Sequence, residues 1–217
     1  MIREVDIKEI SDGKKYTSND LVKVVCDDCS GCSACCRNMD ATVLDPFDVY
    51  NISKGLNCSF QELLGDKVEL DMIDGVILPK LKMSGVNNSC NFLNEEGRCS
   101  IHPFRPGICR LFPLGRLYEG ESFYYFLQTK ECKKTNLSKI KVSKWLGIQN
   151  IKRYESYVMT WHNLIKEVGR DIAGMNDPDK VRQAGIMMIK LFYVMPYDTN
   201  RDFYQQFEER IGVIKEA

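Results

Sequence analysis

The stretch Cys26-Asp-Asp-Cys29-Ser-Gly-Cys32-Ser-Ala-Cys35-Cys36 holds half of the ten cysteines of this 217-residue chain. Its first four cysteines fall at strict intervals of three, a spacing that closes tight loops and brings thiolates to one ion. Small residues between them let the backbone wrap closely, and successive two-residue gaps are typical of iron–sulfur proteins. The stretch therefore predicts a loop, not a helix, that is organised by a metal.

The adjacent cysteines Cys35 and Cys36 are harder to satisfy together. In an extended segment neighbouring side chains point to opposite faces, so the two thiolates would not easily ligate the same small ion. On that basis the vicinal pair predicts two metal centres or one multinuclear centre.

The other cysteines lie outside this block. Three form a second block, Cys90 to Cys109, and one follows a predicted strand; these four are too far apart for local chelation and must be brought in by the fold: Cys90, Cys99, Cys109 and Cys132. Cys58 stands alone at the start of a predicted helix, where a cysteine is more often a small core residue. His102, three residues after Cys99, is either a ligand or second-layer donor or a turn-capping or partly buried histidine, and we favour the latter.

Metal is favoured over disulfides because of the compartment that the sequence indicates. The opening residues MIREVDIKEI are charged and lack the apolar core of a signal peptide, so we expect a cytoplasmic protein, where thiols stay reduced. No stretch approaches the roughly 18 apolar residues of a membrane span. Lys plus Arg equals Asp plus Glu, at 30 each, and this balance gives no electrostatic argument for a nucleic-acid partner.

The remaining patterns predict an α+β protein. A small loop-rich half, stapled by metal and built of β-hairpins and short helices, is expected to pack against a C-terminal helical half. We place the metal-binding region at residues 1–136 and the helical region at 137–217, within one integrated domain. For the first half we predict a strand at Leu21–Val25, an extended segment at Val76–Leu78, a turn at Asn94–Gly97 and a hairpin over Gly115–Gln128.

Helices are predicted by caps and by apolar spacing. Asp45-Pro46 and the capping box Ser59–Glu62 open two short helices, the first ending near Gly55. From Val142 to Val168 apolar residues recur at helical spacing, with Gly169 as the stop. Asp177-Pro178 and Asn200-Arg-Asp open two more helices. The aromatic residues of this half, including Trp145, Tyr154, Tyr157 and Trp161, are interpreted as core.

The two cysteine blocks resemble a known family. Cys29-x2-Cys32-x2-Cys35-Cys36, then Gly97-Arg-Cys99-Ser-Ile-His102, then Arg105-Pro106-Gly-Ile-Cys109-Arg110 together look like the YkgJ-type cysteine-cluster family, a zinc- or iron-chelating domain whose cluster is similar to that of flagellin lysine N-methylases. The resemblance covers about Cys29 to Cys132 and implies eight metal ligands: Cys29, Cys32, Cys35, Cys36, Cys90, Cys99, Cys109 and Cys132. Cys26 and Cys58 fall outside the pattern. The nearby Arg105, Arg110 and Arg116 either offset the negative charge of a thiolate cluster or make ordinary salt bridges.

Three functions are open at this level. We favour a metal-binding protein that carries an iron–sulfur cluster, with zinc as the alternative, and that acts on or with another protein by redox or modification. An S-adenosylmethionine-dependent protein lysine N-methylase rests on family analogy alone, and no glycine-rich nucleotide loop or catalytic residue supports it. In the third reading zinc is purely structural, and every ligand position is filled by protein.

Overall fold

The computed structural model describes residues 6–24, 33–39, 42–129, 131–132 and 137–216. The chain divides into two compact units that alternate along the sequence. Unit 1 consists of Met1–Met39, Met83–His102 and Gly107–Thr160, and unit 2 of Asp40–Lys82, Pro103–Pro106 and Trp161–Ala217. The expected boundary of the metal-binding region at residue 136 stays a prediction. Among the described residues, no helix combines the length and the apolar character needed to cross a membrane.

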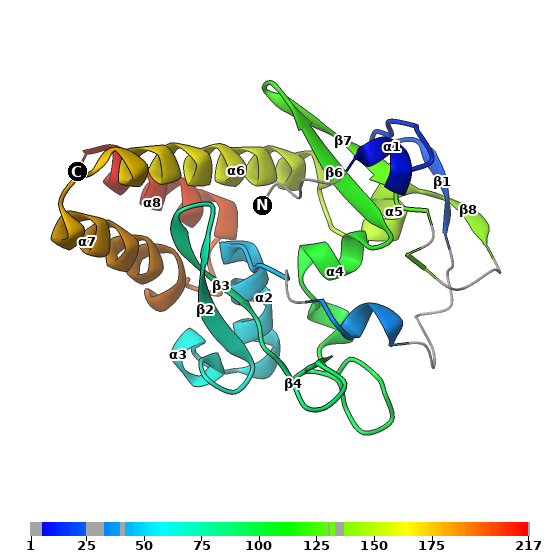
Figure 1. Ribbon diagram of the computed structural model, residues 1–217, viewed down its shortest axis with the longest axis horizontal. Coiled ribbons are helices and arrows are strands. Elements are labelled where there is room, and N and C mark those ends of the chain that lie inside the picture. The colour runs from blue at the N-terminus through cyan, green and yellow to red at the C-terminus, as the bar shows by residue number, and fades with distance from the viewer. Residues whose placement is uncertain (1–5, 25–32, 40–41, 130, 133–136, 217) are drawn as a thin grey trace. The chain divides into compact units, whose positions relative to one another are not determined.

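The architecture is α+β, as predicted, with two-stranded antiparallel sheets and a helical C-terminal region (Figure 1). The hairpin predicted near Gly115 is formed by β6 (Leu114–Glu119) and β7 (Ser122–Leu127). The strand predicted at Leu21 is β1 (Leu21–Val24), which pairs with the distant β8 (Ser138–Lys141) so that Val22 faces Ile140. The short elements of this unit are α1 (Ile7–Ile10), η1 (Ala34–Cys36), β4 (Met83–Ser84), β5 (Ser89–Cys90) and α4 (Gly107–Leu111). The short helix η2 (His102–Phe104) starts at the last residue of this segment of unit 1 and continues into unit 2.

The core of unit 1 lies between the two sheets and the short helices. Apolar side chains from β1, α4, the β6–β7 hairpin and α5 (Val142–Leu146) are buried together: Val22, Val24, Leu111, Leu114, Tyr125, Val142 and Leu146. Helix α4 is tied to α5 because Trp145 Nε1 donates to the Leu111 carbonyl at 3.3 Å. The packed residues are mostly aliphatic, and this core stabilises the two longer sheets and one side of α4.

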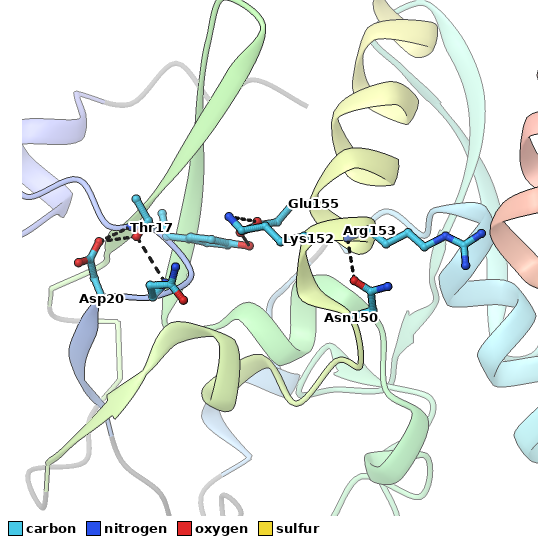
Figure 2. Close-up of polar contacts among 8 residues, drawn as sticks. Thr17, Asp20, Asn150, Lys152, Arg153 and Glu155 are labelled. Carbon is cyan, nitrogen blue, oxygen red and sulfur yellow. Dashed lines mark hydrogen bonds and ion pairs between the residues drawn. The ribbon is translucent and has the colours of Figure 1, made fainter.

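The helical run predicted from Val142 is interrupted, which corrects the prediction. Gly147 adopts the left-handed conformation (φ +63°) and ends α5, and α6 (Ile151–Gly174) begins afresh. Figure 2 shows the start of α6, where Asn150 accepts from the Arg153 amide. Apolar periodicity continues across this break, so periodicity alone could not reveal it.

A polar network joins the hairpin to the first turns of α6. Arg116 donates to the Tyr154 hydroxyl at 2.9 Å, and the Tyr125 hydroxyl donates to Glu155 at 3.2 Å. Lys152 pairs with Glu155 on the same turn, also seen in Figure 2. Burial raises the pKa of Tyr125, the charge of Arg116 opposes that rise and Glu155 adds to it.

Unit 2 begins with the two predicted short helices. Helix α2 (Pro46–Leu56) starts at a reciprocal capping box between Asp45 and Asp48, and α3 (Phe60–Leu63) starts at the predicted box between Ser59 and Glu62. Both boxes satisfy backbone amides that the first turn leaves open. Helix α2 ends near Gly55 as predicted, at Leu56, where Asn57 adopts the left-handed conformation; the Phe104 ring lies where a side chain at Gly55 would stand.

The strands β2 (Val68–Ile73) and β3 (Val76–Leu81) form an antiparallel hairpin in this unit. The prediction that Gly169 ends α6 is wrong. The turn of this hairpin explains why a glycine stands at that position. A Cβ on Gly169 would lie 2.5 Å from the Asp74 carbonyl oxygen. The glycine therefore permits close approach of helix and turn, and α6 continues five residues further to Gly174.

The C-terminal helices enclose an aromatic core. They are α7 (Pro178–Ile189), begun at Asp177 as predicted, the π-helix η3 (Lys190–Val194) and α8 (Phe203–Glu216), which begins just after the predicted Asn200–Asp202 start. Trp161 packs edge-on against Phe192 and Phe207 at centroid distances of 5.1 and 6.1 Å. The predicted core role of the aromatic residues is confirmed for Tyr154, Tyr157 and Trp161, while Trp145 is partly buried.

Candidate metal centre

The vicinal cysteines lie in a tight turn, not in an extended segment. Ser33 has φ +46°, and the Cys36 amide donates to the Ser33 carbonyl at 3.0 Å, which closes the 3-10 turn η1. In such a turn successive side chains do not alternate between opposite faces, and the thiols of Cys35 and Cys36 are hydrogen-bonded to each other. The premise of an extended segment is therefore wrong, and both thiols can serve one site, which leaves a multinuclear centre as a prediction.

The second block is organised by a short turn. Cys90 ends β5, is buried, and its carbonyl accepts from the Leu93 amide. The predicted turn at Asn94–Gly97 is present, closed by the Gly97 amide donating to Asn94 at 2.9 Å, and it places Cys99 opposite Leu93 in a β-bridge.

Contacts far apart in sequence bring the two blocks together. Arg37, next to the vicinal pair, donates to Ser89 Oγ at 2.8 Å and forms a β-bridge with that residue. The Asn38 amide donates to the Asn88 carbonyl. A Cβ added to Gly97 would lie 3.7 Å from Ser33 Oγ, so the turn of the second block lies beside the start of η1.

The electrostatics of Cys36 identify which thiols approach it. The pKa of Cys36 is raised, first by its hydrogen bond with Cys35, then by burial and by the charges of Cys35, Cys109 and Cys99. Cys109 comes from the exposed side of α4. Thiols from η1, the second block and α4 thus lie within electrostatic range of one another, and all of them belong to unit 1.

Two further cysteines lie in other segments of the chain. Cys132 is half-buried after β7, and Cys58 is half-buried between α2 and α3 in unit 2. Cys26, Cys29 and Cys32 lie outside the described residues. Within the residues that are described, no three Cys, His, Asp or Glu side chains are close enough to hold a metal ion. The thiols around Cys36 thus approach one another without reaching ligand geometry, and the eight-cysteine ligand set stays a prediction.

A comparison with protein families covers this same part of the chain. A model described as "CxxCxxCC: Putative zinc- or iron-chelating domain" matches residues 28–140, just over half of the chain. The chain belongs to this CxxCxxCC family. The resemblance to the YkgJ-type cysteine-cluster family is thereby confirmed, and the matched range contains every cysteine of the predicted ligand set. The search of curated proteins and that of solved structures found no match.

Membership in the CxxCxxCC family supports metal binding by the cysteine cluster, with zinc or iron as the ion. The residues present fit such an ion, since the described side chains around Cys36 offer soft sulfur donors, which both metals accept.

The charged residues near the blocks have different positions. Arg116 bonds to Tyr154 of α6 and lies over the Phe123 ring at 5.7 Å, so these contacts join the hairpin to α6. Arg110 follows Cys109 on α4, while Arg105 belongs to unit 2. The His102 amide donates to the Cys99 carbonyl at 3.2 Å, a turn contact of its backbone. Sequence reasoning missed Arg37, because a bond to a serine 52 residues away leaves no local pattern.

Proposed function

We propose that unit 1 of this CxxCxxCC protein holds an iron–sulfur cluster and that the chain acts with a protein partner, by redox or by modification. The proposed ligands are the eight cysteines of the family pattern: Cys29, Cys32, Cys35, Cys36, Cys90, Cys99, Cys109 and Cys132.

The observation that supports the proposal is the approach of thiols from three separate segments to Cys36. Like charges at short range oppose ionisation, so the thiols would become thiolates together only where a cation compensates them. Metal binding supplies that compensation and is coupled to loss of the thiol protons.

The geometry of η1 favours a polynuclear centre over a single zinc ion. Structural zinc is satisfied by four ligands in a tetrahedron, whereas the proposed set has eight cysteines, of which Cys35, Cys99 and Cys109 act electrostatically on Cys36. Clusters accept all-cysteine ligation from runs with two-residue gaps. When bound, such a cluster supplies one-electron transfer; the chain's own residues hold and orient it.

Exposure at α4 supports a partner. Cys109 is exposed, and its neighbour Ile108 is 37% exposed. A protein surface could therefore approach α4 closely. If α4 contacts the partner, Ile108→Glu should abolish co-purification of the partner and leave the metal content unchanged. Retention of the partner by this variant would count against the role of α4.

The test of the metal uses protein produced and purified without oxygen. We expect iron, acid-labile sulfide in comparable amount and broad absorbance near ~400 nm. A colourless anaerobic protein with stoichiometric zinc and no sulfide would overturn the cluster and leave structural zinc.

Single cysteine variants test the ligand assignment. Cys36→Ser and Cys99→Ser should each lose at least half of the iron and sulfide, since serine is a harder and poorer ligand for these metals. Cys58→Ser is the matched control, because it makes the same atomic change in unit 2. Equal metal loss in Cys58→Ser and Cys36→Ser would contradict the assignment.

A further inference from the structure

Unit 2 contains a cavity of roughly 390 Å³ to which neither the cysteine blocks nor the family pattern assigns a role. It is lined by residues of α2, by the first three residues of α3 and by residues between Phe192 and Thr199. All of its lining residues belong to unit 2. Small-molecule sites usually begin at about 300 Å³, so the space suits a compound with a single ring.

The cavity is lined by aromatic rings in fixed positions. The rings of Phe60 and Tyr193 stand 5.6 Å apart, and those of Tyr50 and Tyr197 meet edge-on at 5.9 Å. Tyr193 is buried, and its hydroxyl donates to the Leu44 carbonyl at 3.0 Å, which fixes its orientation. Aromatic rings held in this way favour a flat apolar group that can stack or pack edge-on.

The far wall is held in place by a buried arginine. Arg210, 7% exposed, donates to the carbonyls of Leu191, Met195 and Pro196 at 2.7 to 2.9 Å. Its guanidinium stacks over the Tyr197 ring at 3.5 Å. These bonds take up the carbonyls at the end of the π-helix η3, and π-helical turns often occur at functional sites. The guanidinium of Arg210 is therefore engaged by these carbonyls and by the Tyr197 ring, and we do not assign it to a ligand.

The two charged side chains that line the cavity, Glu62 and Lys54, differ in their hydrogen-bond and ion-pair partners. Glu62 accepts from both the amide and the hydroxyl of Ser59 at 2.7 Å in the capping box of α3. Lys54, at the other end of the lining, lies over the Tyr50 ring at 5.7 Å and has no carboxylate partner among the residues that the structure describes. Burial and the nearby Glu62 raise the pKa of the Cys58 thiol, so it adds no charge at neutral pH.

We propose that this cavity binds a small molecule made of one flat aromatic ring bearing an anionic group. The ring packs among Tyr50, Phe60 and Tyr193, and the anion pairs with Lys54. This ligand differs in place and chemistry from the metal of unit 1.

The experiment is calorimetric titration of the full metal-loaded chain with phenyl phosphate at pH 7.5. Benzyl alcohol, benzylammonium and inorganic phosphate test the ring and the charge separately. We expect phenyl phosphate to bind at least tenfold more tightly than each of the three. Equal affinity for benzyl alcohol or for inorganic phosphate would overturn the proposal, as would the absence of binding at millimolar concentration.

Two variants locate the binding. Lys54→Gln, on the exposed face of α2, should weaken phenyl phosphate about tenfold and leave benzyl alcohol unchanged. Lys180→Gln makes the same change at an exposed lysine of α7 in the same unit. It should leave the affinity for phenyl phosphate unchanged. Binding that is equally strong in Lys54→Gln would place the ligand elsewhere, for example at the metal, and would refute the assignment.

Discussion

Unit 1 and unit 2 are stabilised in different ways. The core of unit 2 is built of large rings, with Trp161, Phe192 and Phe207 in mutual contact and long helices around them. In unit 1 the packed cluster is mainly aliphatic and includes residues of both longer sheets, while the described residues of the cysteine segments form η1, a two-residue strand, turns and the short helix α4. Phe92 and Ile101 of the second block are buried, but the residues of η1 are only half-buried, so we expect metal to add stability to these segments. The comparison indicates that one unit folds by packing and that the cysteine part of the other depends on its metal.

The sharpest way to break this comparison is to remove the metal. Chelation under reducing conditions should abolish hydrogen-exchange protection at residues 33–39 and 89–102, because metal-binding free energy there is also folding free energy. For structural zinc in small peptides that energy is about 10–16 kcal/mol. Protection of α6 beyond Trp161 and of α8 should change little. Mass spectrometry of deuterated peptides reads out both units in one sample.

Uniform loss of protection in both units would show that they do not fold separately. Unchanged protection in the cysteine segments, with metal fully removed, would show that their hydrogen bonds suffice. A zinc-reconstituted sample is the control for damage caused by the chelator.

The converse test removes packing from unit 2. Phe207, 2% exposed, contacts Trp161, Phe192 and Phe203. Phe207→Ala should reduce the free energy of unfolding of unit 2 by about 3–5 kcal/mol, from lost burial and a new cavity. Metal content should remain that of the unaltered protein, as measured by elemental analysis of folded material.

Phe207→Leu is the matched variant, since it keeps most of the volume, and it should cost less than about 1.5 kcal/mol. Loss of metal in Phe207→Ala at a temperature where unit 2 is still folded would contradict the independence of the two units.

Sequence reasoning succeeded where the signal is local. The caps at Asp45, Ser59 and Asp177 each fix a helix start through bonds within three residues, and the hairpin near Gly115 follows from a turn at Glu119-Gly120 and the aromatic strand after it. The cysteine spacing likewise pointed to the family. These patterns depend only on neighbours in sequence.

It failed where the cause is distant. The pairing of β1 with β8 joins residues more than a hundred positions apart, and the tie between Arg37 and Ser89 depends on the folded chain. Gly169 resembled a helix stop, but its reason is the carbonyl of Asp74. The alternation of the two units along the chain also has no compositional boundary to mark it.

A smaller effect tests that interpretation of Gly169. Gly169→Ala places a Cβ 2.5 Å from the Asp74 carbonyl oxygen, and we expect this overpacking to cost unit 2 about 1–3 kcal/mol. Gly212 of α8 has no atom within 4 Å of the equivalent position. Gly212→Ala should therefore gain about 0.5–1 kcal/mol from the better helix propensity of alanine. Chemical denaturation of both variants measures the difference, and equal effects would return Gly169 to the role of an ordinary helix residue.

The smallest effect that we predict is a dependence on pH confined to unit 2. The pKa of His162 on α6 is lowered from 6.5 to about 4, chiefly by burial, with Lys166 contributing and Asp74 opposing. Because the folded state binds this proton more weakly than the unfolded state, stability is fully present above pH 6.5 and declines as the pH falls towards 4. The side chain is half-buried, so solvent screening should keep the loss below about 1 kcal/mol. His162→Gln should remove that part of the slope between pH 6.5 and 4.5, measured by the unfolding of unit 2 in urea. An identical slope in the variant would mean that other groups account for the acid sensitivity and that His162 is hydrated much as in the unfolded chain.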